Sequence, residues 1–294
     1  IRGRIESILS ILPLVAMLIV AGGFGILVSL IGYRALFIGL GAVISVAGIL
    51  GIFIIKDSPV IKKSGSFGDI FYGFRPSVVK SNKSLYATLL IVVVYGIACQ
   101  IFMPYLIIYY EYSLEMKNYV LIMAPAIILA SVATALWGRV YDKKGFKLTG
   151  VIALISLCAG FIILYFFRST VPVFIGSLVM MCGYLAGMAV FGARIRALIP
   201  ENMAGRLQGV RIIGQVLIPG VIGPAVGAWV LRNAQQILNS DGTYSFLPNE
   251  NIFLAAAVAA VAVVMVLGVY FRCQLKPEKK VTYGKMPQRR RYKK

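Results

Sequence analysis

The chain has 294 residues, of which 60% are hydrophobic and 14% are charged, and its mean hydropathy is +0.87. A soluble domain does not bury so large an apolar share, so the composition excludes an ordinary soluble protein and predicts a membrane protein. The formal net charge is +20, and the absence of His excludes metal sites, catalytic triads and proton relays built on that residue.

A bilayer core about 30 Å thick needs about 20 apolar residues in a helix. Eight runs meet this length: 7–31, 35–56, 86–110, 119–138, 148–167, 171–193, 209–231 and 252–271. They are too long and too continuously apolar for barrel strands, which alternate. The sequence therefore predicts an all-α integral membrane protein with eight transmembrane helices.

The positive charges distinguish the two sides of this arrangement. With the N-terminus in the cytoplasm, one side receives 1–6, 57–85, 139–147, 194–208 and 272–294. Of the 30 Lys and Arg residues, the other side holds only four: Arg34, Lys117, Arg168 and Arg232. This bias predicts a multi-pass protein of the cell membrane with both termini in the cytoplasm. It explains the net charge without nucleic acid and places the basic tail 272–294 near anionic lipid head groups.

The span 86–110 contains Tyr95 and Gln100 near its middle and Pro104, which can kink the helix. At its outer end the spacing of the tyrosines predicts an interfacial aromatic belt formed by Tyr109, Tyr110 and Tyr112.

The short connection between the spans 119–138 and 148–167 reads WGRVYDKKGFK, from Trp137 to Lys147. Gly138 permits close approach of neighbouring helices, and Gly145 suits a tight turn. Asp142 is the one acid of this loop and stands among four cations: Arg139, Lys143, Lys144 and Lys147.

This loop resembles the cytoplasmic motif of the major facilitator superfamily, Gly-x-x-x-Asp-(Arg/Lys)-x-Gly-(Arg/Lys)-(Arg/Lys). The matching residues are Gly138, Asp142, Lys143, Gly145 and Lys147. In that family the loop latches two halves of the carrier and controls its conformational switch, so the resemblance implies that role here. Phe146 departs from the pattern, because the family has a cation at this position. The residues themselves also fit an ordinary basic hairpin loop.

A weak internal repeat supports the resemblance. Gly3-Arg4 before the first span is similar to Gly205-Arg206 before the span 209–231. Facilitator carriers consist of two six-helix halves, and helices five and eleven are equivalent. The resemblance therefore implies helices 5–12 of a twelve-helix carrier, with the first four missing from this chain. Residues 1–56 then end the first half, 57–85 form the central loop, and 86–271 form the second half. The alternative is an intact eight-helix protein.

In this fold the solute site lies near the midplane between the halves. The substrate-cavity candidates are Tyr95, Gln100, Tyr184 and Gln215. Arg211 and Gln215 lie four residues apart and share a helix face. Each candidate is also compatible with packing between helices. The run IPGVIGP interrupts helical hydrogen bonding and predicts bending at Pro219, Gly220, Gly223 and Pro224. The span 252–271 is almost free of polar groups and is typical of a lipid-facing support helix.

These features favour a secondary active transporter that moves a small solute by alternating access, without catalytic residues, metal or cofactor. The neutral candidates favour a polar metabolite such as a sugar, with a proton or sodium ion as coupling ion. One alternative is a drug/proton antiporter of the same fold, and another is a membrane fragment or scaffold that does not transport.

Overall fold

The computed structural model describes residues 34–54, 67–116, 119–200, 203–238 and 244–273, together with residues 16, 27 and 30–32. Six helices among them are long and apolar enough to cross a membrane: Arg34–Ile54, Lys83–Ser113, Tyr119–Phe166, Thr170–Leu198, Ala204–Leu231 and Asn251–Arg272. Because Tyr119–Phe166 reverses direction at Gly145, these helices confirm seven of the eight predicted spans. Most of the span 7–31 lies outside the described residues, as do Gly3-Arg4 and the tail 274–294.

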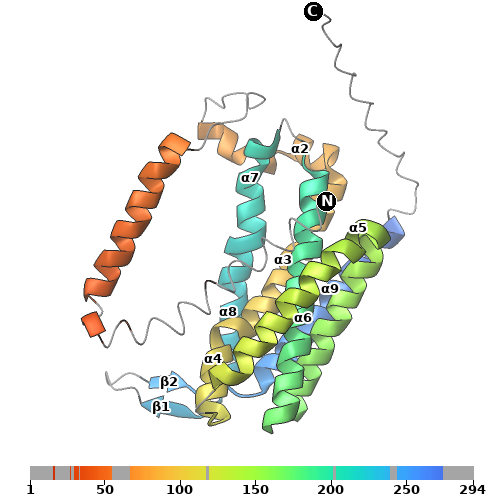
Figure 1. The fold of residues 1–294 in the computed structure, drawn as a ribbon. Coiled ribbons are helices and arrows are strands. Elements are labelled where there is room, and N and C mark those ends of the chain that lie inside the picture. Colours follow the sequence, from red (N-terminus) through yellow and green to blue (C-terminus); the bar gives the residue numbers. More distant parts are fainter. Residues whose placement is uncertain are drawn as a thin grey trace, which may run out of the picture.

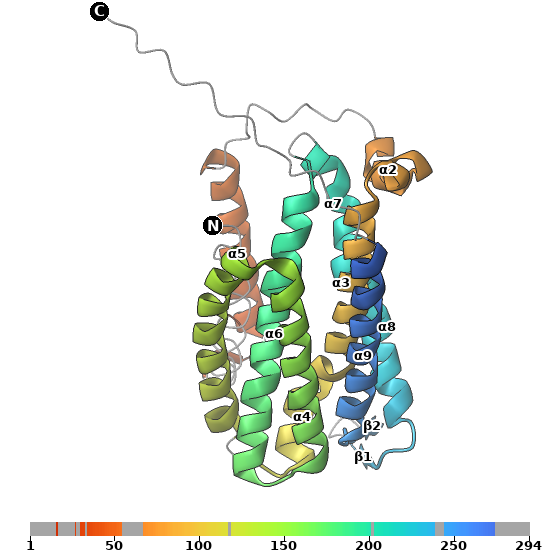
Figure 2. The ribbon, with the colours of Figure 1, turned by 90° about the vertical axis from the view of Figure 1, so that its right-hand side faces the viewer.

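The long helices run alongside one another in a bundle (Figures 1 and 2). The short helices η1 (Phe67–Phe74) and α2 (Pro76–Ser81) lie with α7 (Ala204–Ile212) at the end of the bundle that the charges assign to the cytoplasm. The helix Arg34–Ile54 stands apart from the bundle in Figure 1, and almost all of its residues are exposed. In a bilayer, such an apolar surface is solvated by lipid or by other helices.

The first helix of the bundle is broken near its outer end. It consists of α3 (Lys83–Phe102), the 3₁₀ turn η2 (Met103–Tyr105), α4 (Leu106–Ile108) and the π turn η3 (Tyr109–Ser113). The break coincides with Pro104, whose missing N–H cannot continue the α-helical ladder. The interruption expected at Pro104 is thus confirmed.

The predicted aromatic belt at this end is wrong for two of its three residues. Tyr109 and Tyr110 are 1% and 0% exposed, whereas Tyr112 is 54% exposed. The Tyr110 and Ser177 hydroxyl oxygens lie 2.6 Å apart, within hydrogen-bonding distance. The π turn rotates these neighbouring rings into the bundle, which a count of residues from the end of a span does not anticipate.

The helix α5 (Tyr119–Phe166) is a helical hairpin, and α6 (Thr170–Leu198) packs against it. Gly145 has φ 79° and ψ 179°, a conformation essentially restricted to glycine, and here the chain reverses. The next spanning segment consists of α7 (Ala204–Ile212), the π segment η5 (Ile213–Leu217) and α8 (Ile218–Leu231).

Two short strands follow α8, at the end of the bundle opposite the α5 turn. β1 (Gln236–Leu238) and β2 (Tyr244–Phe246) pair antiparallel, with Gln236 opposite Phe246 and Leu238 opposite Tyr244. The residues Ser240-Asp241-Gly242, whose composition predicts a turn, lie outside the described residues. The fold is nevertheless an all-α membrane bundle, because these strands are three residues each.

An aromatic cluster marks the core between α3, the second arm of α5, and α9 (Asn251–Cys273). The Phe102 and Phe161 rings pack edge-on with centroids 5.0 Å apart, and the Phe253 ring lies 6.3 Å and 6.4 Å from them. One face of α9 is buried, and the other exposes Leu254, Val258, Val261, Met265 and Val269. One side of α9 is therefore available to lipid, as its sequence predicted.

Candidate functional site

The predicted switch loop lies at the tip of the α5 hairpin. Gly138 is buried at the end of the first arm, whereas Asp142, Lys143 and Lys147 are exposed around the reversal. The Lys147 ammonium lies 5.4 Å from the centre of the Phe271 ring in α9, a cation–π contact. Gly145 thus forms the turn, and the charged residues of the motif lie exposed around it, while their role in switching stays a prediction.

Phe146, the residue that departs from the family motif, points into the protein. It is 9% exposed, and its ring contacts the rings of Phe191, Tyr270 and Phe271 at centroid distances of 5.9, 6.2 and 5.9 Å. The Arg194 guanidinium lies 5.5 Å from the Phe146 ring centre. A positive charge from α6 therefore lies beside the ring that replaces the cation of the motif.

Tyr270 connects three helices beside this cluster. The Arg194 guanidinium donates a hydrogen bond to its phenolic oxygen at 3.1 Å, and Thr88 donates one at 3.2 Å. The Ser84 hydroxyl oxygen lies 3.3 Å from the same atom. These contacts join α3, α6 and α9 at the end of the bundle that carries the α5 turn. Sequence reasoning missed Arg194 and Tyr270 because each lies at the edge of a predicted span, where anchoring to the interface is the ordinary explanation.

The short helix η1 is attached to the start of α7. The Arg206 guanidinium lies 4.7 Å from the Tyr72 ring centre, and that of Arg75 lies 5.5 Å from the same ring. Gly73 packs against Val210, and the Tyr86 hydroxyl donates a hydrogen bond to the Gly73 carbonyl. The second copy of the Gly-Arg repeat therefore contacts the segment that precedes the bundle.

Tyr95 and Tyr184, both substrate-cavity candidates, meet at the contact between α3 and α6. Tyr95 is 1% exposed, and its hydroxyl donates to the Tyr184 carbonyl at 2.6 Å. Gly187 lies against the Tyr95 ring. A larger residue does not fit at position 187, because its Cβ would lie 2.4 Å from the Tyr95 hydroxyl oxygen. Tyr95 thus packs between helices, and the half-buried Tyr184 is the more accessible of the two.

Gln100 lies where α3 crosses α8. A Cβ added to Gly223 would lie 2.3 Å from the Gln100 Cβ, and one added to Gly227 would lie 2.7 Å from the Ile101 carbonyl oxygen. The glycines of this Gly-x-x-x-Gly pair let the two backbones approach closely. The Gln100 side chain remains half-buried beside this crossing.

Gln215 is half-buried and paired within its own segment. The Arg211 Nε donates to the Gln215 Oε1 at 2.7 Å, in agreement with their expected shared face. Gln215 belongs to η5, which ends just before Ile218-Pro219, so the residues predicted to bend this helix adjoin a real irregularity. Pro219 and Gly223 are buried, Gly220 is exposed, and the Pro224 carbonyl accepts a hydrogen bond from Tyr105 at 3.1 Å.

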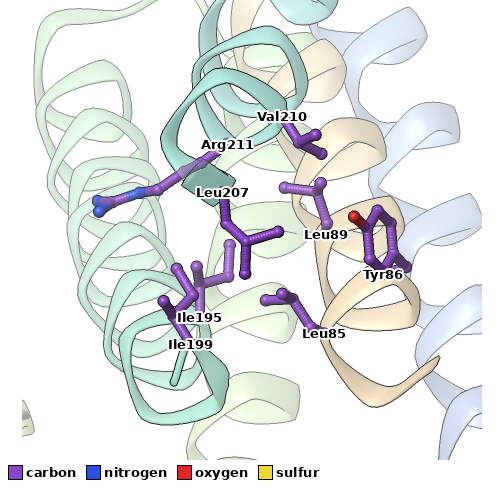
Figure 3. A pocket seen from close by; sticks show the side chains of 8 residues that line it. All are labelled: Leu85, Tyr86, Leu89, Ile195, Ile199, Leu207, Val210 and Arg211. Atoms are coloured by element: carbon purple, nitrogen blue, oxygen red, sulfur yellow. The ribbon is translucent and has the colours of Figure 1, made fainter. Parts of the chain in front are cut away.

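At the same end of the bundle, α3, α6 and α7 close over a very small cavity of about 10 Å³ (Figure 3). In Figure 3 the apolar side chains, among them Leu89, Ile195 and Leu207, point toward one another, whereas the Arg211 guanidinium points away from them. A space of this size holds at most one water molecule, so the structure is closed at this point.

The outer end is held by polar contacts. Arg168, between α5 and α6, forms an ion pair with Glu250 at 2.6 Å, and Ser113 donates a hydrogen bond to the Pro248 carbonyl. These residues line a cavity of about 360 Å³, together with the residues that come directly before β1 and directly after β2. Within the described part of the chain, no cluster of three or more His, Cys, Asp or Glu is placed to hold a metal ion.

Comparison with known protein families gives a match over most of the chain. The family model described as Major Facilitator Superfamily matches residues 1–224, which is more than half of the chain and includes the α5 hairpin. No curated protein matches the chain.

Proposed function

Because this chain belongs to the major facilitator superfamily, whose members are secondary transporters of small solutes, we propose that it moves an uncharged polar solute by alternating access. Membership makes it a multi-pass membrane protein of a family that is generally non-enzymatic. The solute class, the mechanism and the orientation of the termini belong to the proposal.

The proposed architecture follows the repeat. The six spanning segments from α3 to α9 form the second half, Arg34–Ile54 belongs to the first, and the segment 57–85 connects them. Contacts at both ends hold this second half together, because the Arg194–Tyr270 contacts join helices on one side and the Arg168–Glu250 pair joins segments on the other. In alternating access this half moves as a body against the first.

The observation that carries the solute class is the chemistry of the half-buried groups. Gln100 lies on α3, Tyr184 on α6 and Gln215 on η5, and both α6 and η5 contact α3. All three side chains are half-buried and neutral. In the described spans, no Asp or Glu lies at mid-depth. Neutral donors and acceptors suit a hydroxylated solute such as a sugar, with a proton or sodium ion coupled elsewhere in the protein.

A counterflow measurement tests this proposal. Membrane vesicles containing the protein are loaded with an unlabelled hexose, and entry of the radiolabelled hexose is followed. We expect entry above that of empty vesicles, and we expect Gln100→Leu and Gln215→Leu to lower it at least ~10-fold, because a site built around hydrogen bonds loses them. The same change at the exposed outer residue, Gln235→Leu, is the control and should leave the rate unchanged.

Two other outcomes overturn the proposal. Proton-driven export of a cationic dye without hexose counterflow establishes the drug/proton antiporter. Absence of both activities, in vesicles where the protein is folded, establishes a membrane protein that does not transport on its own.

A further inference from the structure

The segment that precedes the first bundle helix exposes two aromatic rings. Phe71 and Phe74 of η1 are 59% and 47% exposed, and their ring centroids lie 6.5 Å apart. Side chains three residues apart lie on the same face of a 3₁₀ helix, so the two rings form one aromatic face of η1. Gly73, by contrast, is buried against Val210 of α7. The helix therefore has one side against the bundle and an aromatic face directed away from it.

This segment lies at the depth where two spans begin. The Tyr86 hydroxyl donates a hydrogen bond to the Gly73 carbonyl, and Tyr86 is the first residue of the predicted span 86–110. Val210, which packs against Gly73, is the second residue of the predicted span 209–231. Figures 1 and 2 show α2 and the start of α7 together at this end of the bundle. The aromatic face therefore lies where the hydrocarbon of a bilayer meets its head groups.

Cations surround the aromatic face. The segment 67–83 and α7 together carry one acid, Asp69, and five cations: Arg75, Lys80, Lys83, Arg206 and Arg211. The Arg75 and Arg206 guanidinium groups lie 5.5 Å and 4.7 Å from the centre of the same ring, Tyr72. Both arginines are exposed. Two like charges held beside one ring repel each other, and an anion close to both lowers that energy.

We propose that residues 71–83 form an interfacial anchor that binds an anionic phospholipid. In this anchor Phe71 and Phe74 insert between the upper parts of the acyl chains, and Arg75 and Arg206 bind the lipid phosphate. Aromatic rings next to Lys and Arg are typical of segments that lie in a membrane interface. Guanidinium groups bind phosphate through paired hydrogen bonds. The anchor does not depend on which solute the protein moves.

Photocrosslinking in vesicles tests this proposal. In the whole protein, p-benzoylphenylalanine replaces either Phe71 or Phe74, and each variant is reconstituted into an equimolar mixture of phosphatidylglycerol and phosphatidylcholine. The two lipids have the same acyl chains, so only their head groups differ. After irradiation, mass spectrometry counts the adducts of each lipid on the labelled peptide. The control has the same probe at Val258, an exposed residue in the middle of α9.

We expect lipid adducts at both positions of η1, with at least about 3-fold more phosphatidylglycerol than phosphatidylcholine, because each cation near an anionic bilayer surface strengthens the attraction about 5-fold. At Val258 the two lipids should react about equally, since about 21 Å of helix separate it from Arg272 at the basic end of α9.

Substitution of the arginines tests the role of charge. With the probe at position 74, Arg75→Gln and Arg206→Gln should each lower the ratio of the two adducts at least about 2-fold. Arg139→Gln is the matched control, because it removes the same charge from an exposed position near the α5 turn, and it should leave the ratio unchanged.

Three results overturn the proposal. Crosslinks from both η1 positions to another part of the polypeptide show that protein covers the aromatic face. Absence of adducts at both positions shows that the rings face water. Equal lipid ratios at positions 74 and 258 show that the cations of the anchor do not select the lipid. Each ratio is measured within one variant that elutes as a single species in gel filtration, so it does not depend on differences in yield or stability between variants.

Discussion

Gly145 shows how one residue determines the shape of the α5 hairpin. Its positive φ of 79° places it where side chains are strained, although a Cβ there would meet no atom within 4 Å. The requirement for glycine therefore comes from the backbone alone. The Thr149 hydroxyl supports the turn by donating to the Gly145 carbonyl at 2.7 Å.

We predict that Gly145→Ala lowers the free energy of unfolding by about 1–3 kcal/mol, the usual cost of a strained backbone conformation. The matched control is Gly268→Ala in α9, where there is also open space and the φ is helical. That change should be neutral or stabilising by up to about 1 kcal/mol. Unfolding in increasing sodium dodecyl sulfate measures both, and equal effects would contradict a cause specific to the turn.

The inward orientation of Phe146 predicts the effect of replacing it. Phe146→Arg restores the family's usual cation but places it beside Arg194 in a buried ring cluster. We expect a loss of about 3 kcal/mol or more of stability, since an unpaired charge is buried. Phe146→Leu keeps an apolar side chain and should cost about 1 kcal/mol. If the Arg variant is as stable as the unmodified protein in the same assay, the inward orientation of Phe146 is wrong.

At the scale of the helices, the crossing of α3 and α8 depends on the absence of side chains. We predict that Gly223→Ala lowers stability by about 1–3 kcal/mol, because overpacking pushes helices apart. The added Cβ would meet the Gln100 Cβ at 2.3 Å and the backbone carbonyl carbon of Gln100 at 2.8 Å. Gly220→Ala on the same helix meets no atom within 4 Å and should not destabilise. Similar unfolding midpoints for both variants would refute this packing account.

The helices were largely predictable, and their irregularities were not. A span needs only an apolar run of sufficient length, so 86–110 and 171–193 coincide with parts of longer helices. Pro104 indicated where the first helix of the bundle is interrupted, whereas α8 continues as a helix through Pro219 and Pro224. The π segments were not predicted because they carry no sequence pattern. One of them, η3, contains Tyr109, whose side chain points inward.

Of the candidate site, the turn was predictable. The chain reverses at Gly145, as the preference of glycine for tight turns predicted, while the roles of the site residues stay predictions. The partners of Phe146 and the burial of Tyr95 depend on which helices become neighbours, which the separate spans do not encode.

At the scale of the whole molecule, the distribution of charge predicts how the bundle lies in the membrane. In a variant with all four cysteines replaced, we expect Lys143→Cys to react with a membrane-impermeant maleimide only from the cytoplasmic side. Asn233→Cys should react only from the opposite side. Both positions are exposed and lie at opposite ends of the bundle, so reaction from the same side would refute the proposed topology.

The one-residue reversal of α5 also has a consequence for proteolysis. The loop carries Arg139, Lys143, Lys144 and Lys147, four bonds of the kind that trypsin cleaves. A protease must bind several residues in extended form, but this backbone is helical on both sides of Gly145. We therefore expect brief trypsin treatment of inside-out vesicles to leave the α5 hairpin intact. A connection with four possible cleavage sites is thus predicted to resist the enzyme that recognises them.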